Sequence, residues 1–274
     1  MTAVRTADKK TGGNNAALLF SILIVLGIAI LLASQFMKTN EKKAPEILDS
    51  SLSAREKASS YAYAILLKAD SAGFMGGTPI TVNSSIQRVG RVDMDKKFMY
   101  DAVSEDVVGV PEGLISSRHA RAESYVVNTT LYLAVNATWF RQELTEDVWT
   151  QTQLQQEGNV IKDANVKLVG TEDVQGENAY VLEIKPDLNA MMAHASESGS
   201  AQLLNQPLSN ERVQEYTIKE WISTESLLPL KAVNTFTLAS DNITTTIKGS
   251  VEYSNFNKPI STELPREAEN ALQM

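Results

Sequence analysis

The sequence predicts an α+β fold: an antiparallel sheet of about ten strands with helices packed against it, preceded by one transmembrane helix. Three observations predict it. A single uncharged segment, Ala16 to Met37, is long enough to cross a bilayer. From Ser59 onward, apolar residues recur at every second position, as they do in half-buried strands. Short polar turns separate these runs, which favours antiparallel neighbours.

Composition limits the function classes. The chain has 274 residues, of which 43% are hydrophobic and 21% are charged, and this is an ordinary globular composition. There is no cysteine, which excludes disulfides, thiolate catalysis and a cysteine-based zinc site. The net charge of −8 and the lack of a basic stripe with interleaved aromatic residues indicate no nucleic-acid partner.

The uncharged segment predicts a retained membrane anchor. As a helix with a rise of ~1.5 Å per residue, residues 16–37 would be roughly 33 Å long, enough for the ~30 Å hydrocarbon core. A cleaved signal peptide is the alternative. Its apolar region usually spans about 7–15 residues and ends in a small-x-small site. Leu31-Leu32-Ala33-Ser34 matches such a site poorly, so the anchor is the preferred interpretation.

The distribution of charged residues predicts on which side of the membrane the large domain lies. Three basic residues precede the span and three follow it, so the positive-inside count is a tie. The rest of the chain is strongly acidic, with 32 acidic against 22 basic residues in 38–274. A single-pass protein of the cell membrane, with its large domain outside, is expected. Its parts are a short cytoplasmic tail at 1–15, the span at 16–37, a polar linker at 38–45 and an exterior domain at 46–274.

A short helix and a long strand open the exterior domain. Pro45 suits the first turn of a helix, and residues 46–57 have the pattern of a short amphipathic one. From residue 59 the period changes to two, because apolar side chains alternate with smaller or polar ones. The alternating residues of this predicted half-buried strand are Tyr61, Tyr63, Ile65 and Leu67.

The remaining elements are expected as follows. Gly73 to Gly77 turns the chain, and residues 107–119 form a loop. Helices are expected at 146–159 and at 188–206, the second rich in Met, Ala and Ser. Strands are expected at about 80–91, 97–103, 121–127, 129–140, 164–174, 178–186, 212–224, 228–240 and 242–256.

Four Asn-x-Ser/Thr sequons are candidate glycosylation sites: Asn83, Asn128, Asn136 and Asn242. In a strand, residues of opposite parity point to opposite faces. All four asparagines fall opposite the apolar residues of their predicted strands, as a glycan would require, if no bulge intervenes. Polar residues face outward in any case, so structural polarity explains the same parity. Together with the absence of cysteine and of a lipidation motif, the sequons would also fit an archaeal cell surface.

No catalytic constellation, cofactor motif or metal site is found. His119 and His194 are the only histidines and lack metal-ligand spacing, so structural or surface roles are expected. Asp93 to Asp95 begins like a calcium loop but lacks its glycine and distal glutamate, which favours a solvated turn. Glu143 and Glu146 with Asp147 could pair as acid and base, yet at a helix start they more simply favour its dipole. The sequence therefore predicts a protein that is not an enzyme and has no cofactor.

Several segments in their chain order resemble a known family. A short helix leads into SYAYAIL, and ESYVVNTTLYLAVNATWFRQ is similar to a pair of strands that ends in an aromatic residue. VKLVGTEDVQGENAYVLEIKPD resembles a hairpin with glycines at Gly170 and Gly176, and EWISTESLLPLKA one with Trp221 and Pro229. YSNFNKPISTELPREA is similar to a closing strand. Residues 46–268 thus resemble the lipoprotein carriers of the LolA family, with the mycobacterial LppX/LprG-type lipid-binding proteins and the RseB sensor domain.

The resemblance implies a strongly curved antiparallel sheet, a half-barrel whose concave face is capped by helices over an apolar cavity. Two departures limit what carries over. LolA is soluble and many relatives are lipidated at a cysteine, whereas this chain has a predicted helix anchor and no cysteine. No carrier-specific arginine can be placed either, so shuttling of lipoproteins does not carry over.

The resemblance and the strand parity together predict the cavity lining, with Met191 and Met192 on a lid helix. The expected function is binding of a lipid or lipoprotein acyl chain, for transfer or sensing. The alternatives are a filled core, a non-catalytic RseB-like interaction or sensor module with an envelope protein partner, and an envelope structural protein. The expected lining residues are Tyr63, Ile65, Leu131, Leu133, Val135, Tyr180, Leu182, Ile184, Met191, Met192, Tyr216, Ile218, Leu230, Phe236, Ile243 and Ile247.

Overall fold

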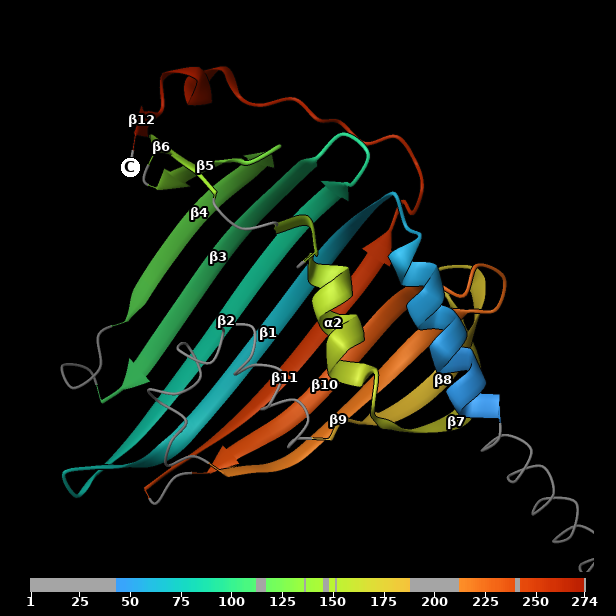
Figure 1. Cartoon of the computed structure of the whole chain (residues 1–274). Coiled ribbons are helices and arrows are strands. Elements are labelled where there is room, and N and C mark those ends of the chain that lie inside the picture. Colours follow the sequence, from blue (N-terminus) through green and yellow to red (C-terminus); the bar gives the residue numbers. More distant parts are fainter. Residues whose placement is uncertain are drawn as a thin grey trace, which may run out of the picture. The chain divides into compact units, whose positions relative to one another are not determined.

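A single twelve-stranded sheet dominates the compact unit Ala44–Met274 (Figure 1). The structure is a computed structural model that describes residues 43–111, 117–135, 137–144, 148–150, 152–187, 212–239 and 242–273. The predicted transmembrane segment, the predicted helix at 188–206 and Asn136 lie outside the described residues. Among the residues that are described, no helix is both long and apolar enough to cross a membrane.

The sheet consists of two antiparallel meanders joined at one seam. Strands β1 to β6 follow one another as neighbours, and so do β7 to β11. The seam is the pairing of β1 with β11, which runs from Ala62 opposite Ser254 to Gly73 opposite Ile243. The strands are β1 (Ser60–Met75), β2 (Thr78–Asp93), β3 (Phe98–Val110), β4 (Arg118–Val127), β5 (Thr130–Val135), β6 (Thr138–Glu143), β7 (Asn165–Val174), β8 (Glu177–Lys185), β9 (Arg212–Ser223), β10 (Pro229–Ala239), β11 (Ile243–Ser254) and β12 (Leu272–Gln273).

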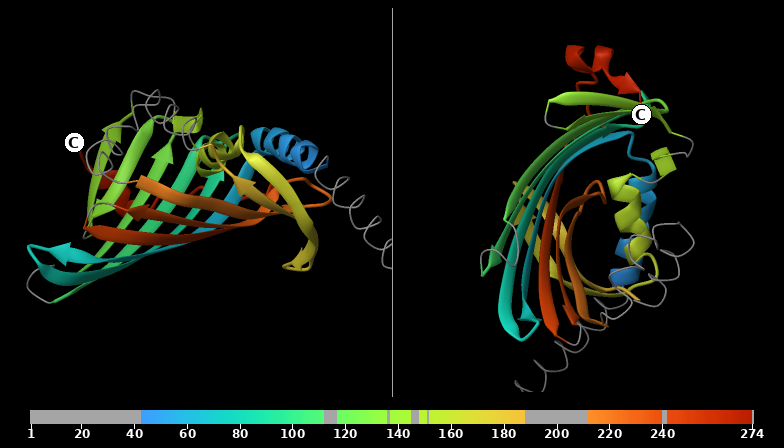
Figure 2. Two further views of the ribbon diagram at one scale, coloured as in Figure 1. Left: turned by 90° about the horizontal axis from the view of Figure 1, so that it is seen from below. Right: turned by 90° about the vertical axis from the view of Figure 1, so that its left-hand side faces the viewer.

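The sheet is strongly curved, and two helices lie on its concave face (Figure 2). One comprises residues 43–56 and the other is α2 (Gln153–Ile161). Both bury apolar side chains against the sheet: Leu48 is 3% exposed and Leu154 is 1% exposed. The predicted curved antiparallel sheet with helices on its concave face is therefore confirmed.

The main core lies between these helices and the sheet. Tyr61, Tyr253 and Phe256 form a ring cluster there, with centroids 5.9–6.1 Å apart. Alternation of side chains along β1 places Tyr61 and Tyr63 on this face, as the period of two predicts. A smaller cluster packs on the other, convex face of the sheet and consists of Ala179, Val181, Trp221 and Leu230.

In the hairpin at residues 165–185, two turn residues with positive φ angles allow a tight connection between the strands. Gln175 and Gly176 have positive φ angles of 58° and 81°, and they connect β7 directly to β8. Glycine adopts this backbone region without steric cost, and the Gly176 N–H donates to Asp173 Oδ1 at 3.1 Å. The strands predicted at 164–174 and 178–186 are confirmed, with shifts of one residue.

Several predicted boundaries were wrong. Residues 129–140 are not one strand, because the chain reverses at Ala137 (φ 64°) and forms β5 and β6. This hairpin and the short β12 raise the strand count from about ten to twelve. Asn128 lies in the β4–β5 turn with φ 56° and not on a strand face. The residues between 107 and 119 contribute strand at both ends, since β3 extends to Val110 and β4 begins at Arg118.

The helix predicted at 146–159 begins later than expected. Val148–Thr150 form a 3-10 turn, η1, and α2 begins after Thr152, whose backbone is extended (φ −66°, ψ 160°). The Gln155 side chain accepts hydrogen bonds from Thr152 N at 3.2 Å and from Thr152 Oγ1 at 2.9 Å. These contacts fix the start of the helix at Thr152. The turn expected at Gly73 to Gly77 is confined to Gly76 and Gly77.

The C-terminal segment returns across the end of the sheet. After β11 the chain passes through the 3-10 helix η3 (Arg266–Asn270) to β12 (Figure 1). There Leu272 and Gln273 pair in parallel with Phe140 and Arg141 of β6. This is the one parallel pairing among the described strands, and it covers part of the β6 edge.

Candidate functional site: the concave apolar face

The concave face has a covered part and a more open part. Under the helices, Tyr63, Val251 and Tyr253 are 4%, 6% and 1% exposed. Further along the same strands and on the same face, Leu67 pairs with Gly249, and Ala69 pairs with Ile247. The side chains there are half-buried. This half-buried part, called the apolar wall below, consists of Leu67, Ala69, Ile86, Tyr216, Phe236, Ile243 and Ile247.

Strand register makes the apolar wall continuous. Ala69 pairs with Ile247, Ile247 with Phe236, and Phe236 with Tyr216, so one row of side chains crosses four strands. Tyr216 and Phe236 are in edge-to-face contact, with ring centroids 5.4 Å apart. In the next row, Leu67 of β1 pairs with Ile86 of β2. Directly opposed residues on one sheet face lie within contact distance, so these two rows form one apolar surface. Ile243 lies beyond it on β11, past the hydrogen-bonded pair Ser71–Thr245.

The structure divides the predicted lining residues into groups. Met191 and Met192 lie outside the described residues. Four residues are buried in the core under the helices: Tyr63, Leu182, Ile184 and Ile218. Val135 is 38% exposed. The half-buried members are Ile65, Leu131, Leu133, Tyr180, Tyr216, Phe236, Ile243 and Ile247.

Leu230 lies on the wrong face for the predicted lining. It belongs to the convex cluster with Trp221 and is 8% exposed. Counting in twos back from Phe236 would place it on the concave face. The register shifts between Pro229 and Lys231, so a β-bulge reverses the parity of Leu230. Short-range alternation does not reveal a bulge of this kind.

Sequence reasoning missed three members of the apolar wall: Leu67, Ala69 and Ile86. A signal existed for Leu67, which continues the alternation of the first strand. It also missed Gly249, which makes room for a side chain of β10. A Cβ atom at Gly249 would lie 2.1 Å from Asn234 Oδ1, so glycine is required while Asn234 keeps this position.

A polar network borders the apolar wall beneath the two helices. Arg55 of the first helix and Glu220 of β9 form an ion pair, and each side chain is 2% exposed. Arg55 Nη1 and Glu220 Oε2 are buried without a hydrogen-bond partner. The Tyr253 hydroxyl is likewise buried and interacts with the Glu157 side chain.

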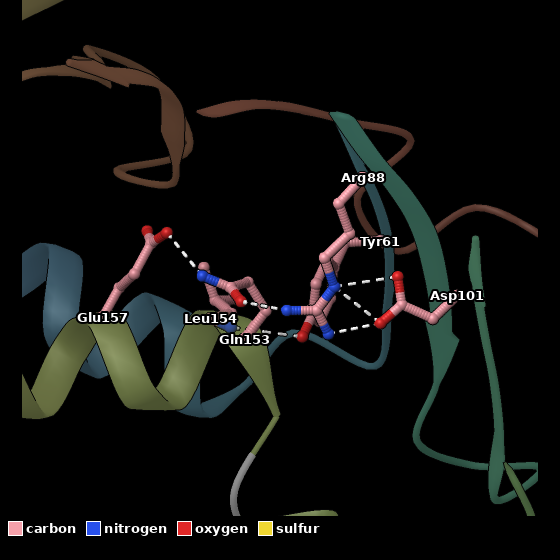
Figure 3. Close-up of polar contacts among 6 residues, drawn as sticks. All are labelled: Tyr61, Arg88, Asp101, Gln153, Leu154 and Glu157. Carbon is pink, nitrogen blue, oxygen red and sulfur yellow. Dashed lines mark hydrogen bonds and ion pairs between the residues drawn. The ribbon is translucent and has the colours of Figure 1, made fainter. Parts of the chain in front are cut away.

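A chain of contacts connects α2 to strands β2 and β3 (Figure 3). Arg88 Nε donates to Asp101 Oδ1 at 2.9 Å and to Oδ2 at 2.6 Å. Arg88 Nη1 donates to Gln153 Oε1 at 3.3 Å, and Gln153 Nε2 donates to Glu157 Oε1 at 2.9 Å. These contacts fix α2 on the concave face, so the border of the apolar wall is held by polar side chains.

Burial sets the protonation of this network. Loss of hydration raises the pKa of Glu157, and Glu220 raises it further, while Tyr253, Gln153 and Arg55 lower it. Loss of hydration also raises the pKa of Tyr253, and the Glu157 carboxylate acts in the same direction. Both pKa shifts are toward the neutral form of the group.

No group of three or more His, Asp or Glu side chains that could hold a metal ion occurs among the described residues. His119 is an exposed residue whose Nδ1 lies 2.7 Å from Asp106 Oδ1. Asp93 is 5% exposed and accepts the Lys96 N–H at 2.9 Å, which makes it a turn-stabilising residue. Asn83, Asn128 and Asn242 are exposed, and their glycosylation stays a prediction.

No protein-family model matches the chain, and neither does any curated protein. Among solved structures, LprF from Mycobacterium bovis is 13% identical, with coverage of 82% of this chain and 97% of that one and a TM-score of 0.42. Mycobacterium tuberculosis lipoprotein LppX is also 13% identical, covering 80% and 97%, with a TM-score of 0.38. A domain from Vibrio parahaemolyticus, described as outer membrane lipoprotein-sorting, is 12% identical, covers 84% and 97%, and has a TM-score of 0.25.

Proposed function

We propose that the apolar wall binds an acyl chain of a lipid or of a lipidated protein. The observation that carries the proposal is the contrast along one sheet face. Core side chains such as Tyr63 and Ile184 are buried under the helices, whereas Leu67 and Phe236 on the same face are only half-buried. A contiguous apolar surface of this kind is typical of an interaction or ligand site. The resemblance of the sequence motifs to lipid-binding carriers supports the same reading.

The free energy of transfer favours exchange of the bound acyl chain with a bilayer. Burying an acyl chain of about 16 methylenes is worth roughly 13 kcal/mol relative to water. A lipid that comes from a bilayer has already gained this energy, so transfer to the wall is close to neutral, less the cost of immobilising the lipid. A protein of this type suits transfer or sensing of a lipid more than permanent storage.

The proposal includes a membrane anchor. Residues 16–37 would hold the domain on the exterior side of a cell membrane, as their apolar composition and the acidic remainder favour. Tethering raises the effective concentration of the domain at the bilayer, where lipid or lipidated protein is found. The archaeal cell surface is one setting that fits the sequons and the absence of cysteine.

The test uses two neighbouring leucines on opposite faces of β1. Leu67 belongs to the apolar wall, while Leu66 pairs with Ser250 and Gln87, away from the wall, and is 36% exposed. Native mass spectrometry of the full-length chain, extracted from membranes, should show bound lipid for the wild type and for Leu66→Arg. Leu67→Arg should lose most of it, because a guanidinium on the wall would be desolvated by an acyl chain.

Two results would overturn the proposal. One is wild-type protein that is free of lipid. The other is equal lipid content in the two arginine variants. Lipid-free protein that crosslinks in cells to one stoichiometric envelope protein would instead favour the sensor module.

A further inference from the structure

A separate pocket lies on the convex side of the sheet, away from the apolar wall. Its volume is about 410 Å³, within the range of small-molecule sites. Strands β1, β2 and β3 form its floor, and the segment after β11 forms one side. Ala62, Arg91 and Tyr100 are directly opposed in the register and therefore share a face, and their chain neighbours Tyr63 and Gly90 also line the pocket. The segment after β11 contributes Asn255, Pro259, Ile260 and Ser261.

Arg91 is the charged group of this pocket, and it has no acidic partner among the residues that the structure describes. The other arginines that pair in the described part of the chain do so with carboxylates, whereas no ion pair of Arg91 is formed there. Its Nε atom is buried without a hydrogen-bond partner. Glu123 on β4 is paired with Arg121 at 3.2 Å and forms no ion pair with Arg91. In a chain with a net charge of −8, an unpaired guanidinium inside a pocket is an anion-attracting group.

Two aromatic rings hold this guanidinium in place. Arg91 Cζ lies 4.9 Å from the centre of the Tyr100 ring and 5.9 Å from that of Phe98. Such contacts stabilise the cation without consuming its N–H donors. The Nη donors stay available to a carboxylate or phosphate, which a guanidinium can bind through two parallel hydrogen bonds.

The rest of the lining defines the ligand further. Val89 is 49% exposed, and Pro259 and Ile260 add apolar surface beside it. Asn255 and Ser261 bring neutral hydrogen-bonding side chains to the same pocket. One cation, a few neutral polar groups and an apolar side match a molecule with one acidic end and a short apolar part.

We propose that the pocket around Arg91 binds a small amphiphilic anion, a carboxylate or phosphate ester with a short apolar group, independently of the concave face. Arg91 is the residue that recognises the acidic group, and Val89 with Ile260 contacts the apolar part. The acidic group could belong to a free metabolite or to a lipid headgroup. Either source presents the same chemistry to Arg91.

The test uses the full-length chain in phosphatidylcholine nanodiscs and three probes: octanoate, octyl phosphate and inorganic phosphate. Isothermal titration calorimetry should show saturable binding of octanoate or octyl phosphate, and roughly tenfold weaker binding of inorganic phosphate. Arg91→Gln should weaken the tighter probe by about tenfold or more. Lys68→Gln, which removes one positive charge from an exposed position outside the pocket, should bind like the wild type.

A second variant keeps the test valid if Arg91→Gln does not fold. Val89→Glu places a negative charge at a half-exposed position of the lining and should also weaken the probe by about tenfold. In native mass spectrometry, Arg91→Gln should keep the bound lipid that Leu67→Arg loses, which separates this site from the proposed lipid site. Nanodiscs that contain phosphatidic acid should compete with octyl phosphate only if a lipid headgroup can reach the pocket.

Three results would overturn the proposal. They are no binding of any probe at millimolar concentration, unchanged binding by folded Arg91→Gln or Val89→Glu, and binding of inorganic phosphate as tight as that of octyl phosphate.

Discussion

Arg55, in the helix of residues 43–56, and Glu220, on strand β9, form an ion pair in which each side chain is only 2% exposed to solvent. Each residue also has one buried atom without a hydrogen-bond partner, Nη1 of Arg55 and Oε2 of Glu220. The pair therefore connects the helix to the sheet through a contact that water does not reach.

Removal of one member of this pair should cost more than removal of both. Glu220→Gln leaves the Arg55 charge buried and uncompensated, so we expect a loss of about 3–5 kcal/mol in the free energy of unfolding. Arg55→Met combined with Glu220→Leu should cost clearly less, because no buried charge remains. Urea unfolding of the full-length chain in detergent, followed by tryptophan fluorescence, measures both.

Glu105 supplies the control, since its partner Arg118 is 65% exposed. Glu105→Gln should change the free energy of unfolding by less than about 1 kcal/mol. A double variant as unstable as the single one would contradict the expectation for the buried pair.

Gly90 is needed because the Tyr63 ring lies directly over it. A Cβ atom at this position would lie 2.3 Å from Tyr63 Cζ and 2.4 Å from its hydroxyl oxygen. Gly90→Ala must displace the ring, and we expect a loss of about 1–3 kcal/mol. Gly170→Ala is the matched control, because no atom lies within 4 Å of the added methyl group. Equal melting temperatures for the two variants would show that the ring moves freely.

The raised pKa of Glu157 predicts that the free energy of unfolding depends on pH. Loss of hydration raises its pKa in the folded protein above the ordinary value of 4.5. As the pH rises from about 4.5 to the folded pKa, the unfolded chain binds fewer protons than the folded one, so the free energy of unfolding falls. Glu157→Gln should remove this part of the slope and stabilise the protein at neutral pH.

Urea unfolding at a series of pH values measures this slope. The exposed Glu56 provides a comparison, and Glu56→Gln should keep the wild-type dependence. A Glu157→Gln variant that is less stable than the wild type at pH 7 would show that the ionised carboxylate is favoured by Arg55 more than burial disfavours it.

The two faces of β10 should respond differently to truncation. Leu230→Ala removes a side chain from the convex cluster and should cost about 2–5 kcal/mol, yet leave the lipid content unchanged. Phe236→Ala opens the apolar wall, where the side chain is half-buried, so the lipid content should fall with a smaller loss of stability. Native mass spectrometry and urea unfolding separate the two effects. Lipid loss in Leu230→Ala, with retention in Phe236→Ala, would reverse the assignment of faces.

Much of the fold could be predicted because its strands follow the period of two. Tyr61, Tyr63 and Ile65 alternate along β1, and the Gly176 turn marks the hairpin of β7 and β8. The curvature came from the family resemblance, since periodicity alone does not determine how far a sheet bends. The break between β5 and β6 was missed because Ala137 is not a residue that usually marks a turn with positive φ.

The candidate site was less predictable. Parity assigned Phe236 and Ile247 to the concave face, where the structure places them, but it could not foresee the bulge that moves Leu230. It also gave no means to separate Ile184, buried under a helix, from Ile243, which is half-buried. That distinction depends on where the helices lie, and this is decided by long-range contacts such as Arg55 with Glu220. The Arg91 pocket depends on a segment more than 160 residues further along the chain, which local patterns do not reveal.

The seam between β1 and β11 has a consequence for biosynthesis. Ser71 on β1 is hydrogen-bonded to Thr245 on β11, and 174 positions separate them. At a synthesis rate of about 5–20 residues per second, β11 is synthesised on the order of ten seconds or more after β1. During that interval one edge of β1 is open to other chains, so the newborn protein should depend on chaperones until its last long strand emerges.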